Sequence, residues 1–176
     1  MRLLAISGSM RAASTNTAFL HALAGLAPQG VSLSLLSGLD ALPIFNPDLE
    51  GHPPETVRRF VARIEAAEGL IISSPEYIRA LPGGLKNAID WLVSGEVIIA
   101  KPVALAHASH RGDDMLADLR RVLATVSTRF SPDIFLRVPL MKLTPREVAA
   151  HLAQPEPGAQ ARAFLADFAA FCADPA

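Results

Sequence analysis

The sequence holds very few of the residues that some classes of protein require. Cys172 is the one cysteine among 176 residues, which excludes a disulfide within the chain. The net charge is only −1, so no excess of one sign favours nucleic acid or an anionic membrane as a partner. No apolar run is long enough to span a bilayer, and no signal peptide precedes the first strand pattern. We therefore expect a cytoplasmic protein that does not bind a membrane.

Apolar residues are abundant by contrast. They make up 51% of the chain and charged residues 19%, a balance typical of a soluble globular protein. The length suffices for one domain with its own core, and neither a repeat nor a low-complexity segment interrupts it, so we predict a single domain over residues 1–176. His21, His107 and His151 lack the mutual spacing of metal ligands, and no metal site is expected.

Strand and helix patterns alternate along the whole chain. Apolar runs of strand length occupy residues 3–6, 31–36, 70–72, 102–108 and 133–138. Amphipathic helical patterns follow at 19–26, from 54 to the stop at Gly69, and at 82–93, 114–128 and 158–172. This alternation predicts a three-layer α/β/α fold with a five-stranded parallel sheet in the flavodoxin-like order 2-1-3-4-5. Ligands of such sheets bind beyond the carboxyl ends of the strands, where the winding reverses.

The first polar loop, residues 7–17, lies between a strand and a helix. Gly8 and the alanines leave space for a ligand, and Arg11 offers a planar charged fork suited to phosphate oxygens. Further donors come from Ser9, Ser14, Thr15, Asn16 and Thr17. Together with the helix dipole, this loop predicts a phosphate site. The alternative is an ordinary connection capped by Ser14 or Asn16.

A second loop follows the third strand, over residues 74–82. It contains a rigid Pro75 turn, exposed backbone amides and Tyr77, which is the one tyrosine of the chain. A flat heteroaromatic ligand fits such a loop, with the tyrosine covering a ring face. The alternative is a turn before a packing helix, in which Trp91 belongs to the core or to an interface. The long connection 37–54 is of a length that often carries function or an interface.

These two loops carry a resemblance to a known family. Residues 8–16 read Gly-Ser-Met-Arg-Ala-Ala-Ser-Thr-Asn and match the pattern Gly-Ser-x-Arg-x-x-Ser-x-Asn completely. Residues 75–77 read Pro-Glu-Tyr, and 82–91 match Pro-Gly-x-Leu-Lys-Asn-Ala-x-Asp-Trp. The chain thus resembles the NAD(P)H-dependent FMN reductases of flavodoxin-like fold, whose relatives include quinone, azo-dye and chromate reductases.

The resemblance implies a set of cofactor contacts. FMN is the implied cofactor, with its phosphate on Ser9, Arg11, Ser14, Asn16 and Thr17. The flavin ring is implied to lie against Pro75, Glu76, Tyr77 and the backbone of Ile78, with Ser109 approaching from the loop after strand four. Ile78 departs from the family's usual Asn. His110 and Arg111 are also unusual and either shape a second-substrate pocket or belong to a solvated loop.

The resemblance also implies an activity and an assembly. A ping-pong reaction would pass hydride from NADPH or NADH to FMN and then to a quinone, a flavin, an azo or nitro compound, or a metal oxyanion. A homodimer or homotetramer is implied, with the helix at 86–91 near the interface. The alternatives are an FMN-binding electron carrier, which would usually be more acidic, and a flavin-free enzyme that binds a phosphate ligand on the same fold. Arg79 is a candidate contact for an anionic substrate, or a solvated surface residue.

Overall fold

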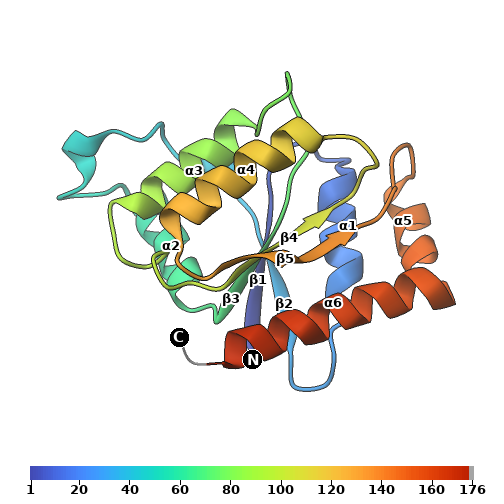
Figure 1. Cartoon of the computed structure of the whole chain (residues 1–176). Helices are drawn as coiled ribbons and strands as arrows, with labels where there is room; N and C mark the ends of the chain where they lie inside the picture. Colours follow the sequence, from blue (N-terminus) through green and yellow to red (C-terminus); the bar gives the residue numbers. More distant parts are fainter. Residues whose placement is uncertain (175–176) are drawn as a thin grey trace.

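The computed structural model describes residues 1–174, and a parallel β-sheet lies at its centre between two layers of helices (Figure 1). The strands are β1 (Arg2–Ser7), β2 (Ser32–Leu36), β3 (Gly69–Ser73), β4 (Val103–His107) and β5 (Phe130–Arg137). Their order within the described residues is β2-β1-β3-β4-β5, and every neighbouring pair is parallel. The predicted fold and strand order are confirmed. The last two residues of the predicted 1–176 domain lie outside the described residues.

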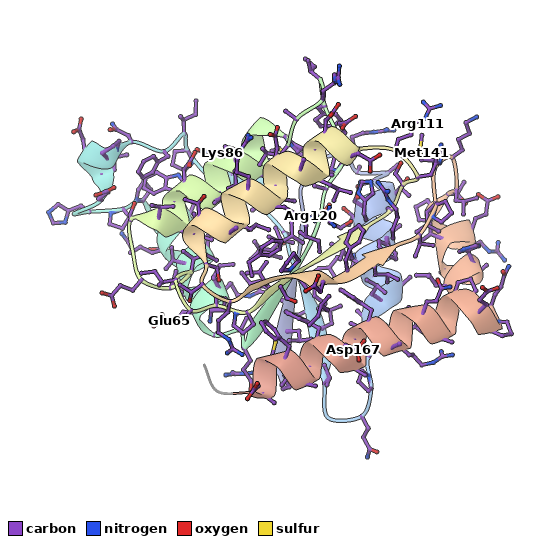
Figure 2. The ribbon with its side chains drawn as sticks, viewed as in Figure 1. Glu65, Lys86, Arg111, Arg120, Met141 and Asp167 are labelled. Carbon is purple, nitrogen blue, oxygen red and sulfur yellow. The ribbon has the colours of Figure 1, made fainter. Side chains whose placement is uncertain are left out.

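Successive side chains of each strand point to opposite faces of the sheet, which divides the core into two layers. Leu4 and Ile6 of β1 face one side of the sheet, whereas Leu3 and Ala5 face the other. The first side is covered by α2 (Glu55–Glu65), α3 (Gly83–Val93) and α4 (Asp113–Val126). The second is covered by α1 (Thr15–Ala24), α5 (Pro145–Leu152) and α6 (Pro155–Ala173). Charged side chains such as Glu65, Lys86 and Asp167 are exposed on the outer faces of these helices (Figure 2).

The C-terminal third differs most from the sequence-based prediction. Helix α5 was not predicted, and α6 begins at Pro155 rather than at residue 158. The start of α5 is a capping box, in which Thr144 accepts from the Glu147 amide and the Glu147 carboxylate accepts from the Thr144 amide. Strand β5 begins at Phe130, three residues before the predicted start at residue 133. A register shift between Val103 and Leu105 accommodates the irregular segment around Pro132, so the strand continues across it.

The loops after β1 and β3 approach each other closely. The Gly8 amide donates a hydrogen bond of 2.8 Å to the Ser73 carbonyl. A Cβ atom on Gly8 would lie 2.5 Å from Ser74 Oγ and 3.0 Å from Leu85, so a larger residue would have to displace the Ser74 side chain. This contact brings the two loops that carry the sequence motifs side by side at the carboxyl ends of their strands. Within residues 1–174, no helix is both long and apolar enough to cross a membrane.

Candidate functional site

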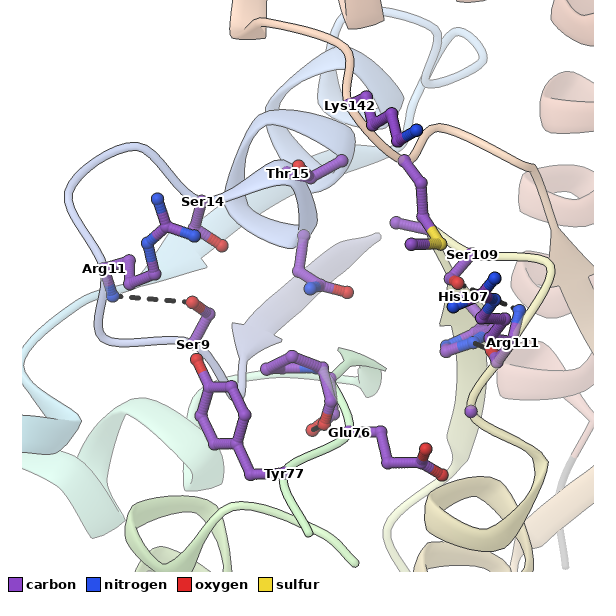
Figure 3. A pocket seen from close by; sticks show the side chains of 16 residues that line it. Ser9, Arg11, Ser14, Thr15, Glu76, Tyr77, His107, Ser109, Arg111 and Lys142 are labelled. Atoms are coloured by element: carbon purple, nitrogen blue, oxygen red, sulfur yellow. Dashed lines mark hydrogen bonds between the residues drawn. The ribbon is translucent and has the colours of Figure 1, made fainter. Parts of the chain in front are cut away.

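A cleft of about 370 Å³ opens beyond the carboxyl ends of the strands, a volume in the range of small-molecule sites. It is lined from four loops, each following a different strand of the sheet. The lining comes from residues 9–16 after β1, 74–77 after β3, 107–112 at the end of β4, and 141–142 after β5. The expected convergence of the loops after strands one, three and four is therefore observed (Figure 3).

The first loop presents donors at the positive end of α1. Ser14 is the N-cap, and its hydroxyl accepts from the Thr17 amide at 3.2 Å. Ser9 Oγ accepts from the Arg11 amide at 3.4 Å, which folds the loop back toward the helix. The first turn of α1 carries no acidic residue that would repel an anion. The exposed Arg11 guanidinium makes no ion pair within residues 1–174 and lines the cleft beside these donors.

Asn16 and Thr17 have different places in this loop. Asn16 is buried, and its Oδ1 accepts a 2.9 Å hydrogen bond from Ser73 Oγ, so its Nδ2 amide is the group left to serve a ligand. Thr17, a predicted phosphate contact, does not line the cleft. Its hydroxyl donates instead to Ser7 Oγ at 2.9 Å, which turns the side chain toward the end of β1.

The loop after β3 ends in a tight turn. Tyr77 and Ala80 exchange two backbone hydrogen bonds of 3.1 Å, and Ile78 and Arg79 between them have φ values of 50° and 59°. The Tyr77 side chain lines the cleft and is 47% exposed. Ile78, whose backbone was predicted to contact the flavin ring, does not line the cleft, because it forms the tip of the turn and is 99% exposed. Arg79 also points away and pairs with Asp114, with 2.6 Å between Nε and Oδ2.

Glu76 connects the second loop to the start of α4. Its Oε2 accepts a 3.0 Å hydrogen bond from the Met115 amide in the first turn of that helix. Gly112 precedes α4 with a φ of 94°, a left-handed conformation that glycine adopts without strain. The carboxylate therefore satisfies a free helix amide and fixes the loop of residues 74–77 against α4.

His107 is a lining residue to which the sequence analysis assigned no role. It is 2% exposed, and its Nε2 lies 2.5 Å from the Arg111 carbonyl, which requires the proton on Nε2. Burial lowers the pKa of the imidazole, against the raising effect of this hydrogen bond, and the Arg137 guanidinium lowers that pKa further. The neutral form of the ring is thereby favoured, and the ring supports the segment 108–112, with Gly112 packed against it.

The remaining lining residues complete the far side of the cleft. Ser109, a predicted cofactor contact, lines the cleft, and its hydroxyl accepts from the Arg111 amide at 2.9 Å. Arg111 lines the cleft, whereas the neighbouring His110 does not. Met141 and Lys142 were missed because they follow β5, outside both motifs. The predicted strand order would have indicated them, because the carboxyl end of β5 lies beside that of β4 and the loop after β5 therefore borders the same cleft.

The geometry defines a flavodoxin-like protein in which a loop of hydroxyl and amide donors with Arg11 and a loop with Tyr77 face one cleft. The sequence matches the NADPH-dependent FMN reductase family over residues 1–139, and the chain belongs to that family.

Among its relatives, a 2-hydroxy-1,4-benzoquinone reductase of Burkholderia sp is 41% identical over 91 residues, which are 52% of this chain and 49% of that protein. An NAD(P)H-dependent FMN reductase of Pseudomonas aeruginosa is 40% identical over 113 residues, 62% of this chain and 60% of the relative. The chain thus matches about half to three fifths of the length of these curated relatives.

The solved structures extend the likeness over almost the whole chain. The flavoenzyme NAD(P)H:(acceptor) oxidoreductase of Paracoccus denitrificans has a TM-score of 0.70 at 26% identity, covering 97% of this chain and 94% of the other. An NADH:FMN oxidoreductase has a TM-score of 0.67 at 19% identity, covering 99% of this chain and 91% of the other, which supports the fold alone.

Proposed function

We propose that the protein is an NAD(P)H-dependent, FMN-containing oxidoreductase that reduces a quinone or a similar small acceptor in the cytoplasm. The observation that carries this proposal is the cleft itself. In a chain of this family, Arg11 at the N-terminus of α1 and Tyr77 on the neighbouring loop line the same opening. These are the groups that an anionic tail and an attached aromatic ring require.

The chemistry of the lining residues fits FMN. Within residues 1–174, Asn16 keeps an amide donor that no protein group uses, and Arg11 keeps an unpaired guanidinium. We propose that the phosphate is held by Ser9, Arg11, Ser14 and Asn16, and the ring by Pro75, Glu76, Tyr77 and Ser109. When bound, FMN supplies the hydride chemistry.

The protein's own groups then bind and orient. Arg11 and the α1 dipole hold a negative charge at one end of the cleft, so that the ring is fixed between the loops after β3 and β4. Glu76 holds the loop of residues 74–77 in place because its carboxylate accepts a hydrogen bond from the Met115 amide. The Tyr77 amide donates to the Ala80 carbonyl and is therefore not free to stabilise negative charge on the ring.

An assembly of two or four copies is part of the proposal. A shallow groove beside α3 is lined by Met10, Leu42, Ile44 and Phe45, and Ile44 is 86% exposed. This apolar surface supports an interface on the exposed face of α3. Trp91 lies on the other face, where it is buried and its Nε1 donates to the Pro43 carbonyl at 2.8 Å. The tryptophan therefore belongs to the core, and Lys86 and Asp90 flank the proposed interface.

The visible spectrum of the purified protein under anaerobic conditions tests the proposal. We expect a yellow protein whose flavin absorbance is lost rapidly when NADPH or NADH is added, and returns when a quinone follows. A yellow protein that reacts with neither nucleotide would identify the electron carrier, a class that the relatives named above do not favour. A colourless protein that takes up no added FMN would reject both flavin functions and leave the flavin-free phosphate enzyme.

A further inference from the structure

Two cations on one side of the cleft have no acidic partner. Arg111 lies in the loop after β4, and Lys142 follows β5, and both are exposed while they line the cleft. Neither side chain makes an ion pair or a hydrogen bond within residues 1–174. Figure 3 places them across the cleft from Arg11, so they stand apart from the group proposed to hold the cofactor phosphate.

The acidic residues nearby are already engaged. Asp113 follows Arg111 closely but pairs with Arg137 at 2.5 Å, and Asp114 pairs with Arg79 at 2.6 Å. Glu76 is the one acidic side chain among the lining residues that the structure describes, and it accepts from the Met115 amide. The positive charge at Arg111 and Lys142 is therefore left for a ligand.

The backbone that carries Arg111 is held firmly. Its amide donates to Ser109 Oγ at 2.9 Å, and its carbonyl accepts from His107 Nε2. The guanidinium thus extends from a fixed point at the edge of the cleft. Met141 lines the cleft as well and is 38% exposed, and Figure 2 shows it close to Arg111 at the same end of the sheet. An apolar thioether beside two cations suits an aromatic ring that bears a negative charge.

We propose that this side of the cleft selects an anionic aromatic acceptor, a quinone bearing an ionised hydroxyl, carboxylate or sulfonate group that Arg111 and Lys142 bind. The inference rests on the proposed function and names the substrate class of the same site. The reaction balances as quinone, NAD(P)H and one solvent proton giving hydroquinone and NAD(P)⁺, and the anionic substituent is unchanged. The same cations would also suit the 2′-phosphate of NADPH, and the experiment separates these two sources of negative charge.

The test compares 1,2-naphthoquinone with its 4-sulfonate as acceptors for the FMN-loaded protein. The variants are Arg111→Gln, Lys142→Gln and the double variant, and Arg121→Gln is the matched control, because Arg121 pairs with Asp118 outside the cleft. We expect kcat/KM for the sulfonate to fall about threefold to fivefold in each single variant, mainly through KM, as exposed charge contacts predict. The values for the neutral quinone and for the control should stay unchanged.

A binding measurement makes the result independent of turnover. Calorimetric titration of the oxidised protein with 9,10-anthraquinone-2-sulfonate should give a dissociation constant that rises in the Arg111 and Lys142 variants and with added salt. Equal losses of kcat/KM for the neutral and the sulfonated quinone would overturn the inference. A shift in the flavin reduction potential that accounts for the changed rates would overturn it as well. A rise in KM for NADPH alone, with NADH and the sulfonate unaffected, would assign the cations to the 2′-phosphate and also overturn it. If neither nucleotide reduces the flavin, the proposed function fails, whereas sulfonate binding still tests the cations.

Discussion

The Ser73 hydroxyl donates a hydrogen bond of 2.9 Å to Asn16 Oδ1, and both side chains are buried. Ser73 ends β3 and Asn16 lies in the first turn of α1, so one contact joins the strand that precedes the loop of residues 74–77 to the helix that follows the loop of residues 8–14. Because Oδ1 is occupied, the Asn16 amide is oriented with its Nδ2 donor available to the cleft. The geometry of the cleft therefore depends on a residue that does not line it.

Replacing Ser73→Ala should weaken both folding and ligand binding. The change leaves the buried Asn16 Oδ1 without a donor, a loss of about 1–3 kcal/mol in the free energy of unfolding. Urea unfolding of the FMN-free protein measures this cost, and fluorescence titration measures FMN affinity, which should also fall. A matched control is Ser131→Ala, a serine far from the cleft. Full FMN affinity in Ser73→Ala would show that the orientation of Asn16 is not used.

Arg11→Ala should weaken FMN binding without affecting the fold. Arg11 is exposed and makes no ion pair within residues 1–174, so its replacement should leave the fold intact and remove the proposed contact with the phosphate. We expect about 1.5 kcal/mol, or roughly tenfold in the dissociation constant, the lower end for a hydrogen bond to a charged group. Quenching of FMN fluorescence gives the constant, with Arg63→Ala on α2 as control. An unchanged constant would place the phosphate elsewhere.

Ile78→Asn should stabilise the protein. A β-branched residue at a φ of 50° is strained, and asparagine tolerates this conformation far better. The gain should be about 1 kcal/mol, visible as a rise in the melting temperature. Ile99→Asn is the control, since Ile99 is also exposed but has no positive φ and lies outside the proposed interface. Equal effects of the two substitutions would show that lost apolar exposure, and not relieved strain, is responsible.

His107 should make stability fall as the pH is lowered. Its pKa in the folded protein is depressed, chiefly by burial, with Arg137 adding to the effect while Asp113 and Glu76 oppose it. As the pH falls, the unfolded chain therefore takes up the proton at a higher pH than the folded protein does. The free energy of unfolding is fully retained above the ordinary histidine pKa. It declines as the pH falls below that value toward the lower pKa of His107 in the folded protein.

The measurement for this prediction is a series of urea titrations between pH 8 and pH 5. His107→Gln keeps a donor for the Arg111 carbonyl but cannot be protonated, so its stability should depend less on pH than that of the unaltered protein. Contributions from the carboxylates are common to both proteins and cancel in the comparison. Parallel pH profiles would contradict a depressed pKa at His107.

The sequence predicts the sheet order well because each buried strand reads as an apolar run. It fails at α5, an eight-residue helix whose main signal is the capping box of Thr144 and Glu147 rather than a long amphipathic pattern. The sequence also does not predict the directions in which side chains within the motifs point. Thr17 and Ile78 lie in matching segments, yet a hydroxyl contact with Ser7 turns one away and the tip of a turn carries the other into solvent.

The far side of the cleft was hardest to predict for a related reason. Met141 and Lys142 reach the cleft only because β5 pairs with β4 in parallel, and neither belongs to a local pattern that could be recognised. The sequence pattern places His107 in a buried strand. Because His107 is the last residue of β4, its ring contacts the segment 108–112 through the Arg111 carbonyl. Short motifs thus locate one half of the cleft, while tertiary pairing determines the other.

The irregular segment around Pro132 has a consequence for how copies of this chain can meet. Proline has no amide hydrogen to donate, and the register shift interrupts the ladder beside it. A strand from a second molecule that paired with the free edge of β5 would lack a hydrogen-bond donor at Pro132. Continuous extension of the sheet from one molecule to the next is thereby discouraged at β5, and contact through helix surfaces is the easier route to a closed assembly.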